Sequence, residues 1–126
     1  MKNPFAASLI ALLIFVSAPA AEDGFQRLFN GRDLQGWDAD PALWRVVDGV
    51  IVGVSEPGKP ATNSFLIWNG TLRDFELRVT IRVIGDNNSG IQYRSRRRPE
   101  ITPWTISGYQ CDVHPVEVHT AMTYEE

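Results

Sequence analysis

Short runs of alternating apolar and polar residues, separated by turn-forming residues, follow one another from residue 25 to residue 114. Alternation with a period of two is typical of β-strands that have one buried face. Between the runs stand Asn-Gly, Asp-Gly and Pro-Gly pairs, which favour turns because Gly and Asn tolerate positive φ and Pro fixes its own. No apolar repeat at helical spacing is sustained. The pattern predicts an all-β domain with strands at 25–29, 44–47, 50–54, 65–68, 75–84, 90–95 and 109–114, and a further candidate at 119–124.

The clearest local signal is Val46-Val47-Asp48-Gly49-Val50-Ile51. An Asp-Gly pair between two apolar runs is typical of a β-hairpin with a two-residue turn. The segment therefore predicts that the strands at 44–47 and 50–54 pair with each other.

The longest run, 75–83, alternates almost perfectly. Phe75, Leu77, Val79, Ile81 and Val83 are expected to face the core, and Glu76, Arg78, Thr80 and Arg82 to face away from it. Two interpretations of the polar face are open. It is either a solvated surface with weak cross-strand ion pairs, or part of a polar concave sheet shared with the strands of Arg94 and Asp112.

Polar, ligand-capable side chains also recur at alternate positions of the two later strands. Gln92 and Arg94 are expected to share one face, opposite Ile91 and Tyr93. In the next strand Gln110, Asp112 and His114 share a face. A sheet needs only one apolar face, so a second face with Arg, Gln, Asp and His predicts a ligand site.

The first 20 residues are typical of a secretory signal. Lys2 is positive, residues 5–16 are almost wholly apolar, and Ala18-Pro19-Ala20 fits the small-residue cleavage pattern. Cleavage before Ala21 leaves 106 of the 126 residues, in one domain over 21–126, and N-terminal sequencing of an exported protein tests it. The apolar run is short for a membrane span of about 20 residues, although an uncleaved anchor is the alternative. The expected location is secreted or periplasmic.

Charge and cysteine content narrow the partners. The net charge of −3 becomes −4 when Lys2 leaves with the signal, which argues against nucleic acid and against an anionic membrane surface. The basic run at 94–98 is more simply a solvated segment than a polyanion site. Cys111 is the only cysteine, and its place on the apolar side of a strand predicts a buried, inert thiol.

Six ordered motifs resemble one family. They are Leu28-Phe29-Asn30-Gly31 through Gly36-Trp37, 44–51, 66–68, 74–77, Asn88-Ser89-Gly90-Ile91 with Arg94, and Gly108-Tyr109. The chain is similar to the 3-keto-disaccharide hydrolase domain, formerly a domain of unknown function. The resemblance implies a concanavalin A-like jelly-roll sandwich of two antiparallel sheets. A jelly roll has about eight strands, and the end of this chain resembles the middle of the family domain, so the domain is expected to be incomplete.

The resemblance also implies hydrolysis of 3-keto-disaccharides or other 3-keto-glycosides. Such chemistry needs a base, a cation near the developing enolate and donors for the sugar. The candidate catalytic residues are Asp112, Arg94 and Glu76; the candidate substrate-binding residues are Asn88, Gln92, Gln110, His114 and Trp68. Many family members have Gly-Tyr-Glu-x-Gln where this chain has Gly108-Tyr109-Gln110-Cys111-Asp112. Whether Gln110 or Asp112 takes the acidic role is therefore open.

Other functions fit parts of the pattern. A non-catalytic carbohydrate-binding module needs the same polar face without a base, and an inactive fragment of a longer protein is a third option. A conventional retaining glucanase is disfavoured because the Glu-x-Asp-x-x-Glu strand is missing. No cofactor or metal is expected, although Asp112, His114, Glu117 and His119 are metal-ligating residue types at loose spacing. The expected partner is a carbohydrate.

Overall fold

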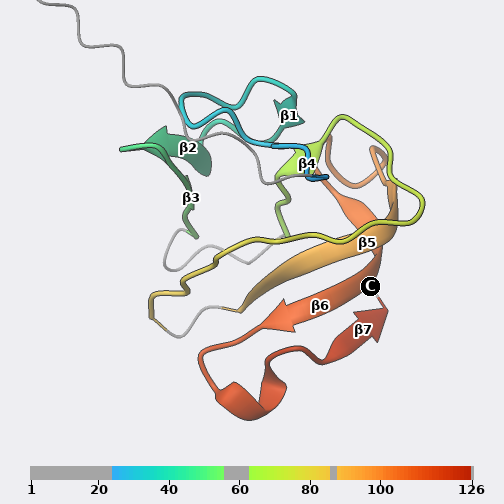
Figure 1. Ribbon diagram of the computed structural model, residues 1–126. Helices are drawn as coiled ribbons and strands as arrows, with labels where there is room; N and C mark the ends of the chain where they lie inside the picture. The colour runs from blue at the N-terminus through green and yellow to red at the C-terminus, as the bar shows by residue number, and fades with distance from the viewer. Residues whose placement is uncertain (1–23, 56–62, 86–87, 126) are drawn as a thin grey trace, which may run out of the picture.

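A computed structural model describes residues 24–55, 63–85 and 88–125 of the chain (Figure 1). The predicted fold class is confirmed: the structure is all-β, and its antiparallel sheet pairs are consistent with a β-sandwich. Two sheets have two strands each, and a third has three. The strands are β1 (Trp37–Asp38), β2 (Trp44–Val47), β3 (Val50–Gly53), β4 (Ile67–Trp68), β5 (Ser89–Arg97), β6 (Ile106–Val113) and β7 (Thr123–Glu125), with a 3₁₀ turn, η1, at Glu117–His119.

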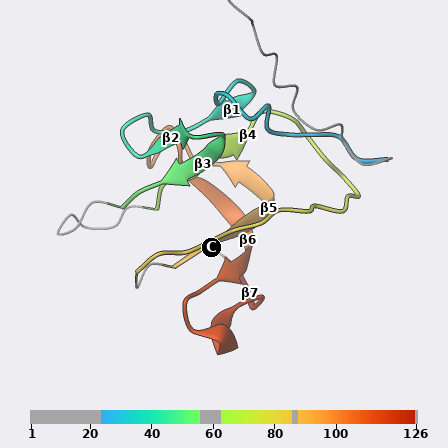
Figure 2. The ribbon, with the colours of Figure 1, turned by 60° about the vertical axis from the view of Figure 1, so that its left-hand side comes forward.

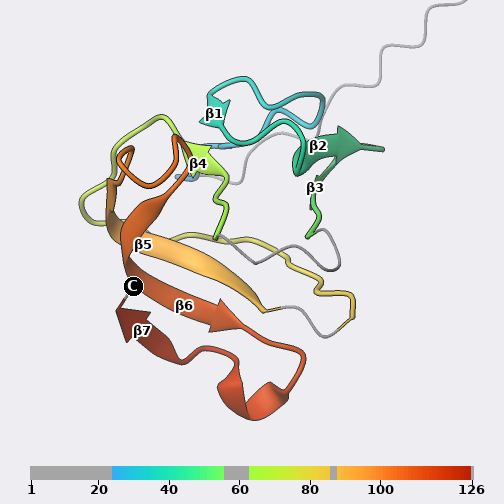
Figure 3. The same ribbon diagram turned by 180° about the vertical axis from the view of Figure 1, so that it is seen from behind.

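The pairs β1–β4 and β2–β3 lie on the β5 side of the β5–β6–β7 sheet in all three views (Figures 1, 2 and 3). The extended segment 75–85 runs alongside β5 in the same views. The N-terminal half is tied to the large sheet by side chains: the Arg97 Nη1 atom of β5 lies 2.6 Å from the Asp38 Oδ2 atom of β1. The Trp104 indole also donates to Asp38 Oδ1, at 3.2 Å.

The Asp48-Gly49 turn forms as predicted. Val47 pairs with Val50 across it, and both turn residues have positive φ, 50° for Asp48 and 76° for Gly49. Positive φ at both central positions defines the type I′ turn, whose twist matches that of the flanking strands. The hairpin prediction is therefore confirmed in pairing and in the length of the turn.

Other strand predictions need correction. Residues 25–29 and 75–84 form no strand, and the predicted strand 65–68 is reduced to Ile67–Trp68. The segment 75–84 has the right alternation, but no strand pairs with it among the described residues. Alternation of apolar and polar residues shows only that successive side chains point to opposite sides. Any extended chain has this arrangement, with or without a hydrogen-bonded neighbour. The candidate at 119–124 is part 3₁₀ turn and part strand β7.

The predicted apolar face of 75–83 is exposed rather than buried. Phe75, Leu77, Val79 and Ile81 are 49%, 39%, 56% and 37% exposed, and only Val83 is half-buried. Across the described part of the chain no hydrophobic side chain is fully buried, and Asp112, at 4% exposed, is the only buried residue. The expected core assignment was wrong because no second layer covers this face within the described residues.

The loop before β1 is organised around one side chain. The Asn30 carboxamide donates to Asp33 Oδ1, and the backbone N–H of Gln35 donates to the same oxygen. The Asn30 hydrogen bond and, after it, the Gln35 N–H hold the pKa of the Asp33 carboxyl below its usual value. These bonds close the loop that delivers the chain to Trp37.

The pH dependence of this loop follows from the lowered pKa. A carboxyl with a depressed pKa stabilises the folded state above its unfolded pKa, and the contribution is lost as pH falls through the folded pKa. We expect an NMR titration of Asp33 to give a pKa below 3.8 and an Asn30→Ala variant to move it back toward that value. An unchanged pKa in the variant would contradict the assignment of Asn30 as the main cause.

Two further predictions concern the N-terminus and the membrane. The predicted signal, residues 1–20, lies outside the described residues. Within the part of the chain that the structure describes, no helix has the length and apolar character needed to cross a membrane.

Candidate functional site

A buried carboxylate lies on one face of the β5–β6 pair. Asp112 Oδ1 accepts a hydrogen bond of 2.8 Å from Gln110 Nε2, and Asp112 Oδ2 lies 3.4 Å from Asn88 Nδ2. The Asp112 side chain belongs to the least exposed residue of the described chain. Burying a charge is costly unless hydrogen bonds compensate, and here two amide groups supply them. The structure therefore brings together three of the predicted site residues.

Strand register explains this cluster. Gly90 lies opposite Asp112, and Gln92 lies opposite Gln110, so the four residues share one face of the sheet. A Cβ atom on Gly90 would stand 2.6 Å from Gln110 Cγ and 2.7 Å from the carbonyl oxygen of Cys111. The missing side chain at position 90 is what lets Gln110 lie across the neighbouring strand and reach Asp112. The expectation that Gln92, Gln110 and Asp112 face the same way is confirmed by the register.

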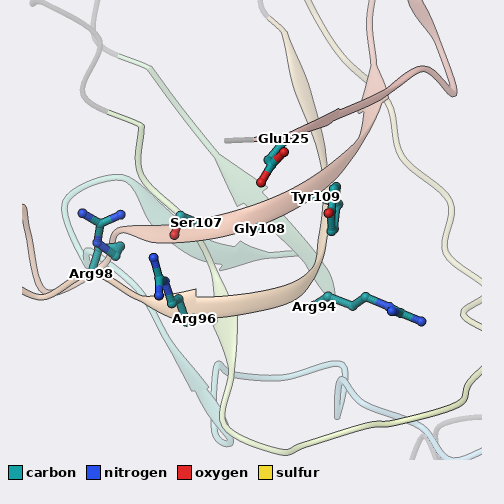
Figure 4. Close-up of a pocket in the computed structure, with 7 residues that line it drawn as sticks. All are labelled: Arg94, Arg96, Arg98, Ser107, Gly108, Tyr109 and Glu125. Carbon is teal, nitrogen blue, oxygen red and sulfur yellow. The ribbon is translucent and has the colours of Figure 1, made fainter.

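The alternation predicted for Gln92 and Arg94 does not continue beyond Tyr93. The register shifts between Tyr93 and Arg96, and Arg94 has a φ of 51°. A β-bulge of this kind adds one residue to one strand and re-aims the side chains that follow. Arg94 consequently extends away from Arg96 and Arg98, from the place where β5 bends (Figure 4).

The bulge determines which face of the sheet each following arginine occupies. Arg96 now pairs with Ser107, on the face of Tyr109, whereas Arg97 pairs with Ile106, on the face of Gln110 and Asp112. Uninterrupted alternation would have given the opposite assignment. The guanidinium that shares the face of Asp112 is therefore Arg97, a residue that the sequence analysis did not select.

The Arg97 guanidinium is held by two partners. Besides its ion pair with Asp38, its Nη2 donates to Asn69 Oδ1 at 3.1 Å. Asp38 in turn accepts from Trp104. These partners come from β1, from the residue that follows β4 and from the loop before β6. No local sequence signal could have found the group, because its members are as much as 66 positions apart.

Three other predicted site residues lie elsewhere. Glu76 forms an ion pair with Arg78 at 2.8 Å and is 66% exposed. Trp68 lies in β4 opposite Trp37, in a different sheet from Asp112. His114 lies just beyond β6, where its Nδ1 accepts the Val116 N–H at 3.0 Å. These contacts give each residue a local structural role and leave its predicted functional role untested.

The metal-ligating residue types after β6 do not converge. The His114 ring packs edge-on against His119, with centroids 5.1 Å apart. Within the described residues no group of three or more His, Cys, Asp or Glu side chains is placed to hold a metal ion. Both Asp112 oxygens instead face amide donors, from Gln110 and Asn88.

Comparison with known proteins decides the family. Residues 24–126 match the 3-keto-alpha-glucoside-1,2-lyase-like domain. The chain belongs to this family. A 3-keto-disaccharide hydrolase of Bacteroides thetaiotaomicron is 31% identical to this chain over 83 residues, which are 60% of this chain and 29% of the relative. The chain thus corresponds to less than a third of that relative's length. No solved structure matches the chain.

The family match confirms the resemblance drawn from the motifs. It covers all of the described residues, including both strands of the Asp112 cluster. Together with the named relative it supports a 3-keto-disaccharide hydrolase-like domain, and it assigns no role to any single residue.

Proposed function

We propose that this chain takes part in the cleavage of 3-keto-glycosides, with Asp112 as the general base. The observation that carries the proposal is the buried Asp112 carboxylate, oriented by Gln110 and Asn88 on a polar sheet face. The family and the named relative support the substrate class. Asp112 is also the only carboxylate in the cluster, because Gln110 acts there as a donor. This favours Asp112 over Gln110 for the acidic role.

The proposed reaction is an elimination followed by the addition of water, and it uses no cofactor. A ketone at carbon 3 acidifies the C–H bond at carbon 2, and the Asp112 carboxylate removes that proton. The electron pair moves onto the ketone oxygen as an enolate and then returns to expel the glycosidic oxygen from carbon 1. The leaving oxygen takes a proton, and water adds across the resulting double bond to give the 3-keto sugar.

The other predicted residues keep supporting roles in the proposal. Asn88 contacts Asp112 and Gln92 shares its sheet face, and both would hydrogen-bond the sugar hydroxyls. The enolate needs a cation or strong donors; Arg94 is the predicted one, and Arg97 is the arginine whose register places it on the face of Asp112. Glu76 as a second carboxylate, and His114 and Trp68 as sugar contacts, complete the proposed set. Export through the predicted signal would place the reaction in the periplasm or outside the cell.

A paired substrate assay tests the function. We expect the purified chain, shown to be folded by circular dichroism, to cleave a 3-keto-disaccharide and to leave the same disaccharide untouched when carbon 3 is not oxidised. The unoxidised sugar lacks the acidic C–H bond, so Asp112 has no proton to remove.

Each other outcome supports a different function. A folded chain that binds the keto sugar without turnover would be a carbohydrate-binding module. Equal cleavage of both sugars would indicate ordinary glycosidase chemistry. An unfolded and inactive chain would assign the activity to a longer protein.

A further inference from the structure

The bulged end of β5 carries an open pocket lined by three arginines (Figure 4). Its volume is about 300 Å³. The lining residues are Arg94, Arg96, Arg98, Ser107, Gly108, Tyr109 and Glu125. Three positive side chains line the pocket against the single negative charge of Glu125, while Glu100, outside the lining, pairs with Arg98. The pocket is therefore locally positive, although the whole chain carries −3.

This pocket is separate from the Asp112 cluster. Ser107 and Tyr109 alternate with Gln110 and Asp112 along β6, so they face the other side of the sheet. The bulge moves Arg96 to this side by pairing it with Ser107, and the Arg98 backbone N–H bonds to the Thr105 carbonyl in continuation of that register. Arg96 and Arg98 accordingly turn their side chains to the same side of β5 (Figure 4).

The charges in the pocket are only partly neutralised. Arg98 is paired with Glu100, but neither Arg94 nor Arg96 forms an ion pair with another residue that the structure describes. Arginine presents several donors in a plane, which matches the paired oxygens of a carboxylate, sulfate or phosphate group. Tyr109, whose ring packs against Tyr93 with centroids 5.9 Å apart, is 40% exposed and offers aromatic surface beside these donors.

We propose that this pocket binds an oxyanionic group, and that the group is the carboxylate or sulfate of an acidic saccharide. Arg96 and Arg98 would contact the oxyanion, Ser107 would donate its hydroxyl, and Tyr109 would contact the sugar ring. The volume, at the lower end of the range for ligand pockets, fits one charged sugar unit. Oxyanion binding stands without the proposed 3-keto-glycoside activity; the choice of a saccharide as its carrier rests on that activity.

Binding can be measured directly on the 126-residue chain by calorimetry and by NMR of the arginine Nε–H groups. The probes are an oligogalacturonate, a neutral oligosaccharide of the same length, inorganic phosphate and a short DNA duplex. We expect the oligogalacturonate to bind more tightly than the neutral sugar and to shift the Nε–H signals of Arg96 and Arg98. Arg96→Ala should weaken this binding roughly tenfold or more, the usual effect of losing a charge-assisted hydrogen bond.

Two variants separate a specific pocket from general charge. Arg73→Ala removes an equally positive but 97% exposed side chain and should leave binding unchanged. Glu125→Gln removes the one repulsive charge in the pocket and should tighten binding, a direction that a purely structural role for Glu125 does not produce. Asp112→Asn should leave acidic-sugar binding intact, so a failed activity assay and a failed pocket are distinguishable.

The remaining outcomes overturn the proposal in whole or in part. Equal weakening by Arg96→Ala and Arg73→Ala, or equal binding of the neutral sugar together with no phosphate binding, rejects the pocket as a site. Phosphate binding without a preference for the acidic over the neutral sugar rejects the saccharide carrier and keeps the oxyanion. DNA binding as tight as that of the oligogalacturonate makes the arginines a general polyanion surface.

Discussion

Replacement of Asp112 by Asn is expected to lower turnover of a 3-keto-disaccharide by roughly 10²- to 10⁴-fold, the usual contribution of a general base. Asn has almost the same shape as Asp, but its amide cannot accept the carbon-2 proton. Asn also keeps one oxygen as an acceptor for Gln110 Nε2, which now lies 2.8 Å from Asp112 Oδ1. The other position becomes an NH₂ group facing Asn88. We expect the mismatch to cost about 1 kcal/mol of stability, too little to unfold a stable domain.

The experiment compares turnover rates and thermal melts of the wild type and the variant. Asp74→Asn is the matched control, because Asp74 is a carboxylate with a 92% exposed side chain that contacts Arg73 at 3.8 Å. The control should keep both rate and melting temperature. A variant at position 112 with the wild-type rate would remove Asp112 from the mechanism and leave Glu76 as the predicted carboxylate to test.

Gly90→Ala should damage both the fold and the site. The added methyl group would stand within 2.8 Å of Gln110 Cγ, Gln110 Cδ and the Cys111 carbonyl oxygen. Contacts this close force a shift, and overpacking typically costs about 1–3 kcal/mol. The displaced Gln110 can no longer hold Asp112, so turnover should fall as well. Chemical denaturation and the keto-sugar assay measure the two effects.

A double-mutant cycle tests whether the Gln110 side chain is what the added methyl group clashes with. Gln110→Ala removes the Cγ and Cδ atoms, so adding it to Gly90→Ala should recover part of the lost stability, while the clash with the Cys111 backbone remains. Ser89→Ala is the control for a change in the same strand, since Ser89 is exposed. Additive losses in the cycle would show that Gln110 does not lie against position 90.

The features that sequence predicted well are local. The Asp48-Gly49 turn needs positive φ at two adjacent residues, and this pair tolerates it at low cost. The shared face of Gln110 and Asp112 follows from two-fold alternation alone. The contact of Asp112 with Asn88 was not predicted, because it depends on the register between two strands.

What sequence did not predict depends on partners distant in the chain. The segment 75–83 alternates like a strand, yet a strand requires a hydrogen-bonded neighbour, and its apolar side requires a covering layer. Arg97 was missed because alternation counted through Arg94 puts it on the wrong face. A non-glycine residue with positive φ is uncommon, and the local sequence around Arg94 does not indicate that Arg94 has one.

The bulge at Arg94 also changes how a basic run should be understood. Five positions that look in the sequence like one block of charge are divided between the two sides of a sheet by a single extra residue. In the two proposals made above, one strand therefore serves two different ligands, a neutral keto sugar on the Asp112 side and an acidic group on the Tyr109 side. Removing one residue at the bulge would exchange the faces of Arg96 and Arg97, and so swap the charge supplied to each surface without altering the composition of the arginines.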